Sequence, residues 1–431
     1  MRLVGHSKGR AATAAALLIL AACGSNSNDS FSEPGKASIK GQTITVLLPY
    51  QIPQALLDDF TAKTGVKVNF NVTGWDAVHT KLIVANSAKT YVADVTEFDW
   101  SFTGQFAGAK WDEPLENVLP AELTADLGNT SGAFTSGGHT YAVCYSNDFR
   151  MSIYNDKLFK QAGLSSFPTT FAELSTAIDK LKGAGVQYPL SIPMAATEGG
   201  VTPWYLLTLA MGGQLFDDKF KPLFADPNSA GHKALQFEVD AVKNGWVSPG
   251  SVTLDDGPAF DKFAAGSTAI NLSSSPGSLA TANDPAQSSV APDIRAGLVP
   301  GIDGPGASFG LPEGLAIPVT AVHKDAALAF ITWWQEPATS IELYKSAGML
   351  PCRTSVLDRL TKTDALAGGS AITDQFKHVV ALFPQGAPVW YSNFSSEAQG
   401  LINAALKGDI TVDDALKQLA TKAETLAKAG S

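Results

Sequence analysis

Strand-like and helix-like patterns alternate in the early part of the chain, and this alternation limits the fold more than any other feature. The strand-like segments are β-branched runs or alternate apolar with polar side chains, and the helix-like segments carry apolar side chains three and four residues apart. The strands are predicted over residues 42–48, 66–72 and 94–98, and the helices over residues 54–64 and 75–87. Strands that alternate with helices form βαβ units and lie parallel in one sheet. The chain is therefore expected to begin with an α/β lobe.

Helical patterns dominate the rest of the chain. Thr170 and Glu173 form the capping box of a helix that Gly183 and Gly185 close. Further helices are predicted over residues 204–211, 232–243, 324–335, 340–347, 373–382, 395–406 and 412–428, and further strands over residues 141–143, 151–154, 267–272 and 314–319. A chain of this length exceeds what one hydrophobic core accommodates, so we expect two domains.

The order of the elements predicts one lobe with a second, helix-rich lobe inserted into it. The first lobe is expected to take residues 41–150 with about 275–350, and the second to take residues 151–274 with about 351–431. The chain would then cross between the lobes more than once. Such a molecule has a groove between its lobes, where the carboxyl ends of strands and the N-termini of helices converge.

The start of the chain has the pattern of an export signal followed by a tether. Residues 1–22 have a basic beginning and then an uncharged run that is too short for a permanent membrane-spanning helix. The run ends in Leu-Ala-Ala before Cys23, which resembles the bacterial lipobox, where the cysteine is acylated and becomes the mature N-terminus. An ordinary signal peptide with an incidental Cys23 is the alternative. Residues 23–40 are poor in apolar side chains and predict a flexible tether. We therefore expect a protein held by lipid at the extracytoplasmic face of the cell membrane.

The charge and histidine patterns argue against nucleic acid, a metal or a cofactor. The formal net charge is -10 and the basic residues are scattered, so nucleic acid is not an expected partner. The histidines form no metal-binding pattern, and neither a metal site nor a cofactor is predicted.

With Cys23 assigned to the lipid, Cys144 and Cys352 remain. In an oxidising compartment they form either a disulfide or two separate buried thiols.

Several segments, taken in order, resemble one protein family. They are residues 57–68, 93–100, 153–164, 167–174, 263–270, 327–331 and 348–353. They are similar to the carbohydrate-binding group of extracellular solute-binding proteins that feed ABC importers. The resemblance implies an α/β, two-lobe periplasmic-binding-protein-like fold with hinge crossings and an interdomain ligand cleft. It also implies a monomeric receptor for a di- or oligosaccharide that serves the permease subunits of an ABC transporter. The chain departs from the family at Pro276-Gly277, where relatives have Gly-Trp.

Candidate ligand-binding residues are of the types that recognise sugars and lie where the chain is expected to leave its strands or turn. Aromatic rings stack on the apolar faces of a sugar, and carboxylate, amide or guanidinium groups bond its hydroxyls. Each aromatic residue could equally pack in the core, and each acid could be solvated or form an ion pair. The candidates are Tyr50, Gln51, Trp75, Asp76, Glu97, Asp99, Trp100, Asp148, Arg150, Trp204, Glu313, Trp390 and Tyr391.

Two other functions compete with a sugar receptor. Residues 306–310 fit the Gly-x-Ser-x-Gly pattern of serine hydrolases, but that turn must follow a strand and open a helix, and the flanking glycines and prolines fit neither. No enzyme is therefore predicted. A receptor for a polyamine or another non-sugar solute is the stronger alternative, because acids and aromatics alternate over residues 97–100.

Overall fold

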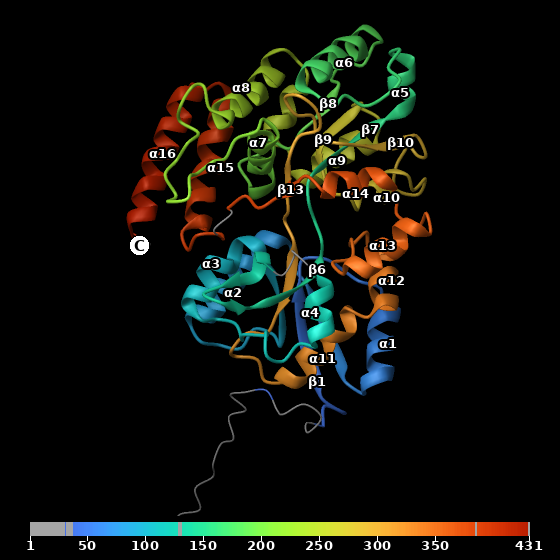
Figure 1. Cartoon of the computed structure of the whole chain (residues 1–431), viewed down its shortest axis with the longest axis vertical. Helices are drawn as coiled ribbons and strands as arrows, with labels where there is room; N and C mark the ends of the chain where they lie inside the picture. The colour runs from blue at the N-terminus through green and yellow to red at the C-terminus, as the bar shows by residue number, and fades with distance from the viewer. Residues whose placement is uncertain (1–30, 32–37, 128–131, 384–385, 430–431) are drawn as a thin grey trace, which may run out of the picture.

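A five-stranded sheet forms the centre of the lobe at the bottom of Figure 1 (the lower lobe). The computed structural model describes residues 31, 38–127, 132–383 and 386–429. The strand order is β2-β1-β3-β12-β6. The strands are β1 (Thr43–Leu48), β2 (Lys67–Val72), β3 (Val95–Asp99), β6 (Ala142–Ser146) and β12 (Glu313–Ala316). β1 pairs in parallel with β2 and β3, which confirms the predicted βαβ units, and β12 runs antiparallel to β3 and β6.

Helices cover the lower sheet, and the first two have the predicted bounds. Gly65, at φ 74, ends the first of them in the left-handed conformation that suits glycine. The helical elements of this lobe are α1 (Gln54–Thr64), α2 (Trp75–Ser87), η1 (Trp100–Phe102), α3 (Thr103–Ala109), α4 (Ala121–Leu127), α11 (Lys324–Trp334), α12 (Pro337–Ala347) and α13 (Thr354–Lys362). A small hairpin of β4 (Thr135–Ser136) and β5 (His139–Thr140) completes it.

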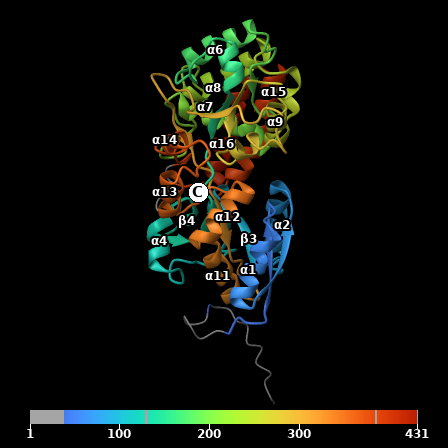
Figure 2. The ribbon, with the colours of Figure 1, turned by 90° about the vertical axis from the view of Figure 1, so that its right-hand side faces the viewer.

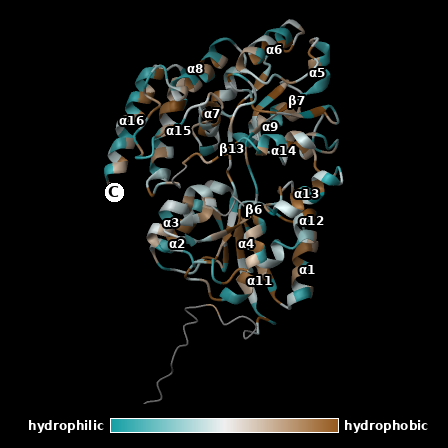
Figure 3. Cartoon of the chain, viewed as in Figure 1, coloured by the Kyte–Doolittle hydropathy of each residue, from teal (hydrophilic) through white to brown (hydrophobic). Residues whose placement is uncertain are grey.

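The other lobe (the upper lobe) has a four-stranded sheet and most of the later helices, and the two lobes are stacked along the long axis (Figures 1 and 2). Its strands, in the order β10-β7-β9-β8, are β7 (Met151–Asn155), β8 (Leu190–Ser191), β9 (Ile270–Ser274) and β10 (Ile294–Gly297). Its helical elements are α5 (Asp156–Gln161), α6 (Phe171–Gly183), α7 (Glu198–Ala210), α8 (Ala230–Lys243), η3 (Pro249–Thr253), α9 (Asp256–Ala264), α10 (Ser278–Ala282), α14 (Ser370–Phe376), α15 (Tyr391–Lys407) and α16 (Val412–Ala429). The predicted capping box at Thr170 is present. Figure 3 shows that apolar residues concentrate on the strands of both sheets.

Extended segments carry the chain between the lobes. The segment from β6 to β7 contacts the one from β11 (Ser308–Phe309) to β12, because Phe149 bridges Gly310 and the Leu311 amide donates to the Asp148 carbonyl at 2.8 Å. β11 also pairs in parallel with β13 (Val379–Val380). Three segments of chain therefore lie together where the lobes meet.

The lobe boundaries and one helix differ from the sequence prediction. α10 and β10 lie in the upper lobe although residues 275–350 were assigned to the lower one, because β10 pairs with β7. α13 contacts α4 of the lower lobe, so the last crossing follows α13 rather than beginning near residue 351. The helix predicted over residues 373–382 ends at Phe376. Pairing with β11 draws the following residues into β13 instead.

The lower lobe contains the disulfide bond that the sequence left open. Cys144 on β6 is joined to Cys352, with their Cα atoms 5.9 Å apart and a sequence separation of 208. Both cysteines are buried. The bond links β6, an edge strand of the lower sheet, to the segment that leads into α13.

The predicted signal peptide (residues 1–22) and lipid-modified Cys23 lie outside the described residues. Of the predicted tether, residues 23–40, the structure describes Phe31 and residues 38–40. Phe31 and Ile39 pack against the hydrophobic core, so these two positions are not part of a free linker. None of the helices in the described ranges has the length and apolar character needed to cross a bilayer.

One glutamate is buried in the upper lobe without a hydrogen-bond partner. Glu238 on α8 is 0% exposed, and neither of its carboxyl oxygens has a partner among the described residues. Burial raises its pKa well above the ordinary value of 4.5. The folded protein therefore holds a proton that the unfolded chain releases, and stability falls as the pH rises above about 4.5.

We expect Glu238→Met to raise the free energy of unfolding at pH 7 by about 1–3 kcal/mol, because it removes an unsatisfied buried carboxyl group. The gain should shrink as the pH is lowered toward 4.5, the ordinary pKa of glutamate. Urea unfolding at pH 5 and pH 7.5 measures both effects. Glu424→Met, at an exposed position on α16, is the matched control and should change little. A loss of stability in Glu238→Met would contradict the expectation.

Candidate ligand-binding site

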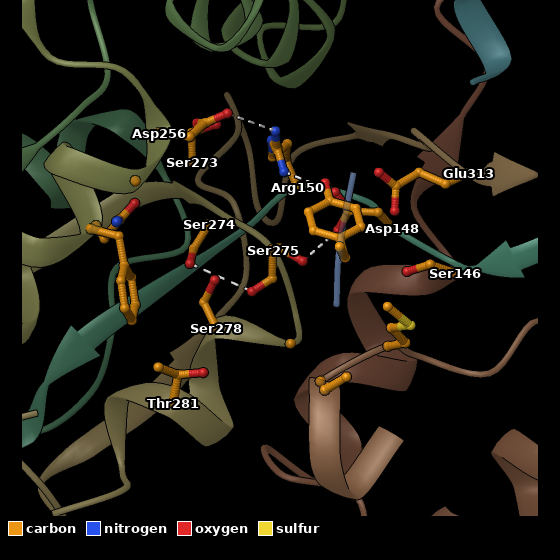
Figure 4. A pocket seen from close by; sticks show the side chains of 18 residues that line it. Ser146, Asp148, Arg150, Asp256, Ser273, Ser274, Ser275, Ser278, Thr281 and Glu313 are labelled. Atoms are coloured by element: carbon orange, nitrogen blue, oxygen red, sulfur yellow. Dashed lines mark hydrogen bonds and ion pairs between the residues drawn. The ribbon is translucent and has the colours of Figure 1, made fainter. Parts of the chain in front are cut away.

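A cleft between the lobes is lined by residues of both of them (Figure 4). Its main part has a volume of about 420 Å³. A smaller part of about 160 Å³ shares five lining residues with it, so the two are continuous. The shared residues are Tyr50, Asp148, Arg150, Asp256 and Glu313.

The ends of strands place the polar side chains of this cleft. Tyr50 follows β1, Asp99 ends β3 and Ser146 ends β6. From the upper lobe, β9 and the loop after it supply a run of serines, Ser273 to Ser275. Two upper-lobe helices begin at the cleft, α7 with Glu198 and α9 with Asp256. This agrees with the expectation that strand ends and helix starts converge on the groove.

Arg150 holds the centre of the cleft between two carboxylates, as Figure 4 shows. Its guanidinium donates to Asp148 at 2.9 Å and to Asp256 at 3.3 Å. The Ser275 hydroxyl also donates to Asp148, at 2.5 Å. The side chain of Arg150 is only 11% exposed. A chain of polar contacts therefore links the crossing segment to both β9 and α9 of the upper lobe.

Acids outnumber bases in the walls of the cleft. Among the described residues that line it, Arg150 is the one Lys or Arg, against six Asp and Glu. The acids are Asp99, Asp148, Glu198, Asp255, Asp256 and Glu313. The cleft therefore carries a net negative potential wherever these groups are ionised.

Burial and mutual repulsion raise the pKa values of four of these acids, Asp99, Asp148, Asp256 and Glu313. Burial raises the pKa of Asp99 to about 7 and that of Asp256 to about 6. Burial and then the charges of Asp148 and Asp99 raise the pKa of Glu313 well above its ordinary range. The pKa of Asp148 is raised by burial even though Arg150 acts against the shift. The protein therefore supplies too little positive charge near these four carboxyl groups to offset their burial and mutual repulsion.

The fold and the cleft agree with comparisons to known proteins. Residues 47–340, more than half of the chain, match the family described as bacterial extracellular solute-binding proteins. The chain belongs to this family. It is 26% identical over 415 residues, 93% of each chain, to the diacetylchitobiose binding protein DasA of Streptomyces coelicolor.

Solved structures of other solute-binding proteins share the fold of this one. A Thermotoga lettingae solute-binding protein with bound α-D-tagatose superposes with a TM-score of 0.79 at 24% identity, over 90% of this chain and 100% of the other. The maltose-bound MalE3 of T. maritima gives a TM-score of 0.81 at 21% identity, over 89% and 99%. The predicted two-lobe, periplasmic-binding-protein-like α/β fold is confirmed.

Seven of the predicted site residues line the cleft of this solute-binding protein. They are Tyr50, Trp75, Asp99, Trp100, Asp148, Arg150 and Glu313. Asp148 and Arg150, two residues apart, form the ion pair weighed as an alternative, and both also line the cleft. The ring of Trp100 packs 5.1 Å from that of Tyr391, so it joins the lower lobe to the upper one.

Two predicted tryptophans lie in the core and not in the cleft. Trp204 is 0% exposed, and its indole N–H donates to the Gly231 carbonyl at 2.8 Å. Trp390 is buried among Phe216, Phe220 and Phe394. Both residues were candidate ligand contacts with core packing as the alternative, and the structure places both in the apolar packing of the upper lobe.

Three of the other predicted residues, Glu97, Gln51 and Tyr391, also lie outside the set that lines the cleft. Glu97 is buried and accepts a hydrogen bond from Tyr145 at 2.7 Å. Gln51 is exposed and donates to the Ile52 carbonyl. Tyr391 is buried behind the cleft, where its hydroxyl donates to Glu198. Asp76 follows Trp75 in the first turn of α2, and its side chain is outside the described part of the structure.

Sequence reasoning missed much of the upper-lobe wall. Its unpredicted members are Glu198, Asp255, Asp256, Phe260, Asn271, Ser273, Ser274, Ser275, Ser278 and Thr281. A run of three serines directly after a predicted strand was a usable signal, since strand ends were already expected at the groove. Glu198 was missed because the helix was predicted to begin at residue 204, whereas α7 begins at Glu198.

The serine of the hydrolase-like pattern does not stand on a nucleophile turn. Ser308 lies on strand β11 and is 0% exposed. Its hydroxyl donates to the Arg150 carbonyl. The motif therefore serves the pairing of the crossing segments. Among the described residues, no three His, Cys, Asp or Glu side chains are grouped to hold a metal ion.

Proposed function

We propose that this protein is the substrate-binding component of an ABC importer and captures a carbohydrate in the cleft between its lobes. The observation that carries the proposal is the lining of that cleft, where hydroxyl, carboxyl and guanidinium groups from both lobes surround one cavity together with Tyr50, Trp75 and Trp100. Carboxylates and guanidinium groups bond paired hydroxyls, and aromatic faces cover the apolar side of a ring. A relative named for binding diacetylchitobiose supports the same class of ligand.

The ligand is bound without being altered and is delivered to permease subunits. Because only the closed arrangement makes contacts from both lobes at once, a ligand that bridges them shifts the equilibrium toward closure. The transporter then recognises the closed shape. We propose that the protein acts as a monomer at the extracytoplasmic face of the membrane and is held there through lipid on Cys23.

Calorimetric titration of the purified protein with monosaccharides, disaccharides, oligosaccharides and polyols tests the proposal. We expect binding of at least one carbohydrate at micromolar affinity or better, with one ligand per chain and no product released. Binding of non-carbohydrate solutes alone would refute the proposed function, and so would steady hydrolysis of a glycoside.

Two glycines mark a close approach of the lobes beside the cleft. Gly277, at the start of α10, faces Gly348, at the end of α12, and both line the main cavity. A Cβ atom added to Gly277 would lie 2.3 Å from the Gly348 carbonyl oxygen. The φ of Gly277 is -62°, which any residue adopts, so an alanine there strains no turn and acts only on the approach of the lobes.

We therefore expect Gly277→Ala to weaken ligand binding about tenfold or more while leaving the melting temperature of the free protein nearly unchanged. The added methyl group holds the lobes apart, and the closed state loses its contacts to the ligand. Titration calorimetry and thermal unfolding measure the two quantities. Gly183→Ala, where a Cβ meets nothing within 4 Å, is the control and should leave affinity unchanged. Unaltered binding by Gly277→Ala would show that closure does not need this contact.

A further inference from the structure

Two buried polar side chains in the main cavity have no partner. Asn271 and Ser273 lie two residues apart on β9, so their side chains share one face of the strand. They are 3% and 5% exposed, and both line the main cavity. The Asn271 amide oxygen and the Ser273 hydroxyl lack a hydrogen-bond partner among the described residues. Because buried polar groups are normally satisfied, this face is built to receive hydrogen bonds from a ligand.

The hydroxyl-rich wall continues beyond these two residues. Ser274, Ser278 and Thr281 also line the main cavity. Figure 4 shows them with Ser273 on one side of the cleft, and Glu313 and Ser146 on the other. Small hydroxyl side chains both donate and accept. This wall therefore suits a ligand with several hydroxyl groups, and a linear polyamine would leave most of it unmatched.

The smaller part of the cleft has a different character. It is lined by acids and by two tryptophans, Trp75 and Trp100. Asp99, Asp255 and Glu313 form no ion pair with any described residue, and Arg150 is already engaged by Asp148 and Asp256. Neutral donors hold the unpaired acids in place: the Ser101 amide donates to Asp99 at 2.8 Å, and the Thr197 hydroxyl donates to Asp255 at 2.7 Å.

Acids fixed in this way attract a cation more strongly than they attract a hydroxyl group. An ammonium group gains Coulomb energy from each nearby carboxylate in a site partly screened from water, and tryptophan faces add a cation–π attraction. A neutral ligand brings no charge that would favour the ionised form of these acids over the protonated one.

Resting on the proposed function, we infer that the carbohydrate recognised by this protein carries a free amine, as in an amino sugar or an aminocyclitol. Its hydroxyl groups lie along Asn271 and Ser273, and its ammonium group enters the smaller part of the cleft, beside Asp99 and Asp255. The inference names the class of ligand and accounts for both the hydroxyl-rich wall and the acidic one.

Matched ligands that differ only in the amine test the inference. The probes are glucosamine, N-acetylglucosamine and glucose, together with chitobiose, N,N′-diacetylchitobiose and cellobiose, titrated by calorimetry at pH 7. We expect an amine-bearing member to bind at least tenfold more tightly than its acetylated and hydroxyl counterparts. The preference should shrink as salt is raised from about 20 to 300 mM, because salt screens charges.

Two variants separate the charge effect from the hydroxyl effect. Asp255→Asn keeps the shape and the bond from Thr197 but removes a charge, so it should weaken the amine-bearing probe several-fold more than the acetylated one. Ser273→Ala should weaken both probes alike. Equal or tighter binding of the neutral probes, or no binding of any amine-bearing probe, would overturn the inference. If the neutral carbohydrates bind equally or more tightly, the inference fails but the proposed function survives. Binding of spermidine and of no carbohydrate would refute both the inference and the proposed function.

Discussion

Replacing Arg150 by methionine should lower the free energy of unfolding of the ligand-free protein by roughly 2–4 kcal/mol, because its ion pairs are partly buried and a fully buried pair loses about 3–5 kcal/mol when one partner is removed. Arg150 is the shared partner of Asp148 and Asp256, and its side chain is 11% exposed. Without it, two carboxylates face each other across the cleft with no opposing charge. Each would either stay ionised against the repulsion or take up a proton at a cost in free energy.

Chemical denaturation at pH 7 measures this loss, and a double variant identifies its cause. Asp256→Asn in the Arg150→Met background should restore about 1–2 kcal/mol, because it removes one of the two carboxylates that have lost their opposing charge. Asp256→Asn alone should be milder than Arg150→Met. If the double variant is no more stable than Arg150→Met, the loss comes from packing of the arginine stem and not from charge.

Removing the disulfide bond should have an effect of similar size. Cys144 and Cys352 close a loop with a sequence separation of 208 residues. Because a cross-link over a long loop restricts the unfolded chain strongly, the double variant Cys144→Ser/Cys352→Ser should lose about 3–5 kcal/mol of unfolding free energy. Both positions are buried, so serine there also leaves small polar groups in an apolar setting.

Urea unfolding with and without dithiothreitol separates these two contributions. Reductant should lower the midpoint of the natural protein and leave that of the double variant unchanged. Cys144→Ala/Cys352→Ala, which introduces no hydroxyl groups, shows the effect of the cross-link alone. Equal midpoints of the oxidised protein and the alanine double variant would show that the bond adds nothing to stability.

Local patterns predicted the helices and strands better than they predicted their partners. α1 and α2 have the predicted bounds because their apolar spacing lies within the segments themselves, and Gly65 directly follows α1. The place of β12 between β3 and β6 could not be derived, because its partners lie far away in sequence. The same cause explains β13, which has a helix-like sequence but pairs with β11.

The candidate site was predicted where strand ends could be located and missed where they could not. Tyr50, Asp99 and Glu313 adjoin lower-lobe strands, and all three line the cleft. Residue type was a poor guide in the upper lobe, because an aromatic side chain such as Trp204 suits a core as well as a sugar. Serines such as Ser273 carry little signal of their own, and their role depends on where β9 ends.

The point at which the chain enters the fold has a mechanical consequence. β1 starts at Thr43, at the end of the lower sheet remote from the cleft, and leads to Tyr50, which lines the cleft. An anchor upstream of Thr43 would restrain the half of the molecule that carries α1 and α2. The upper lobe, which carries α15 and α16, would remain free to move. Closure around a ligand would then move the upper lobe toward a lower lobe that is held in place. A docking permease would then sense the arrival of cargo mainly as a displacement of the upper lobe.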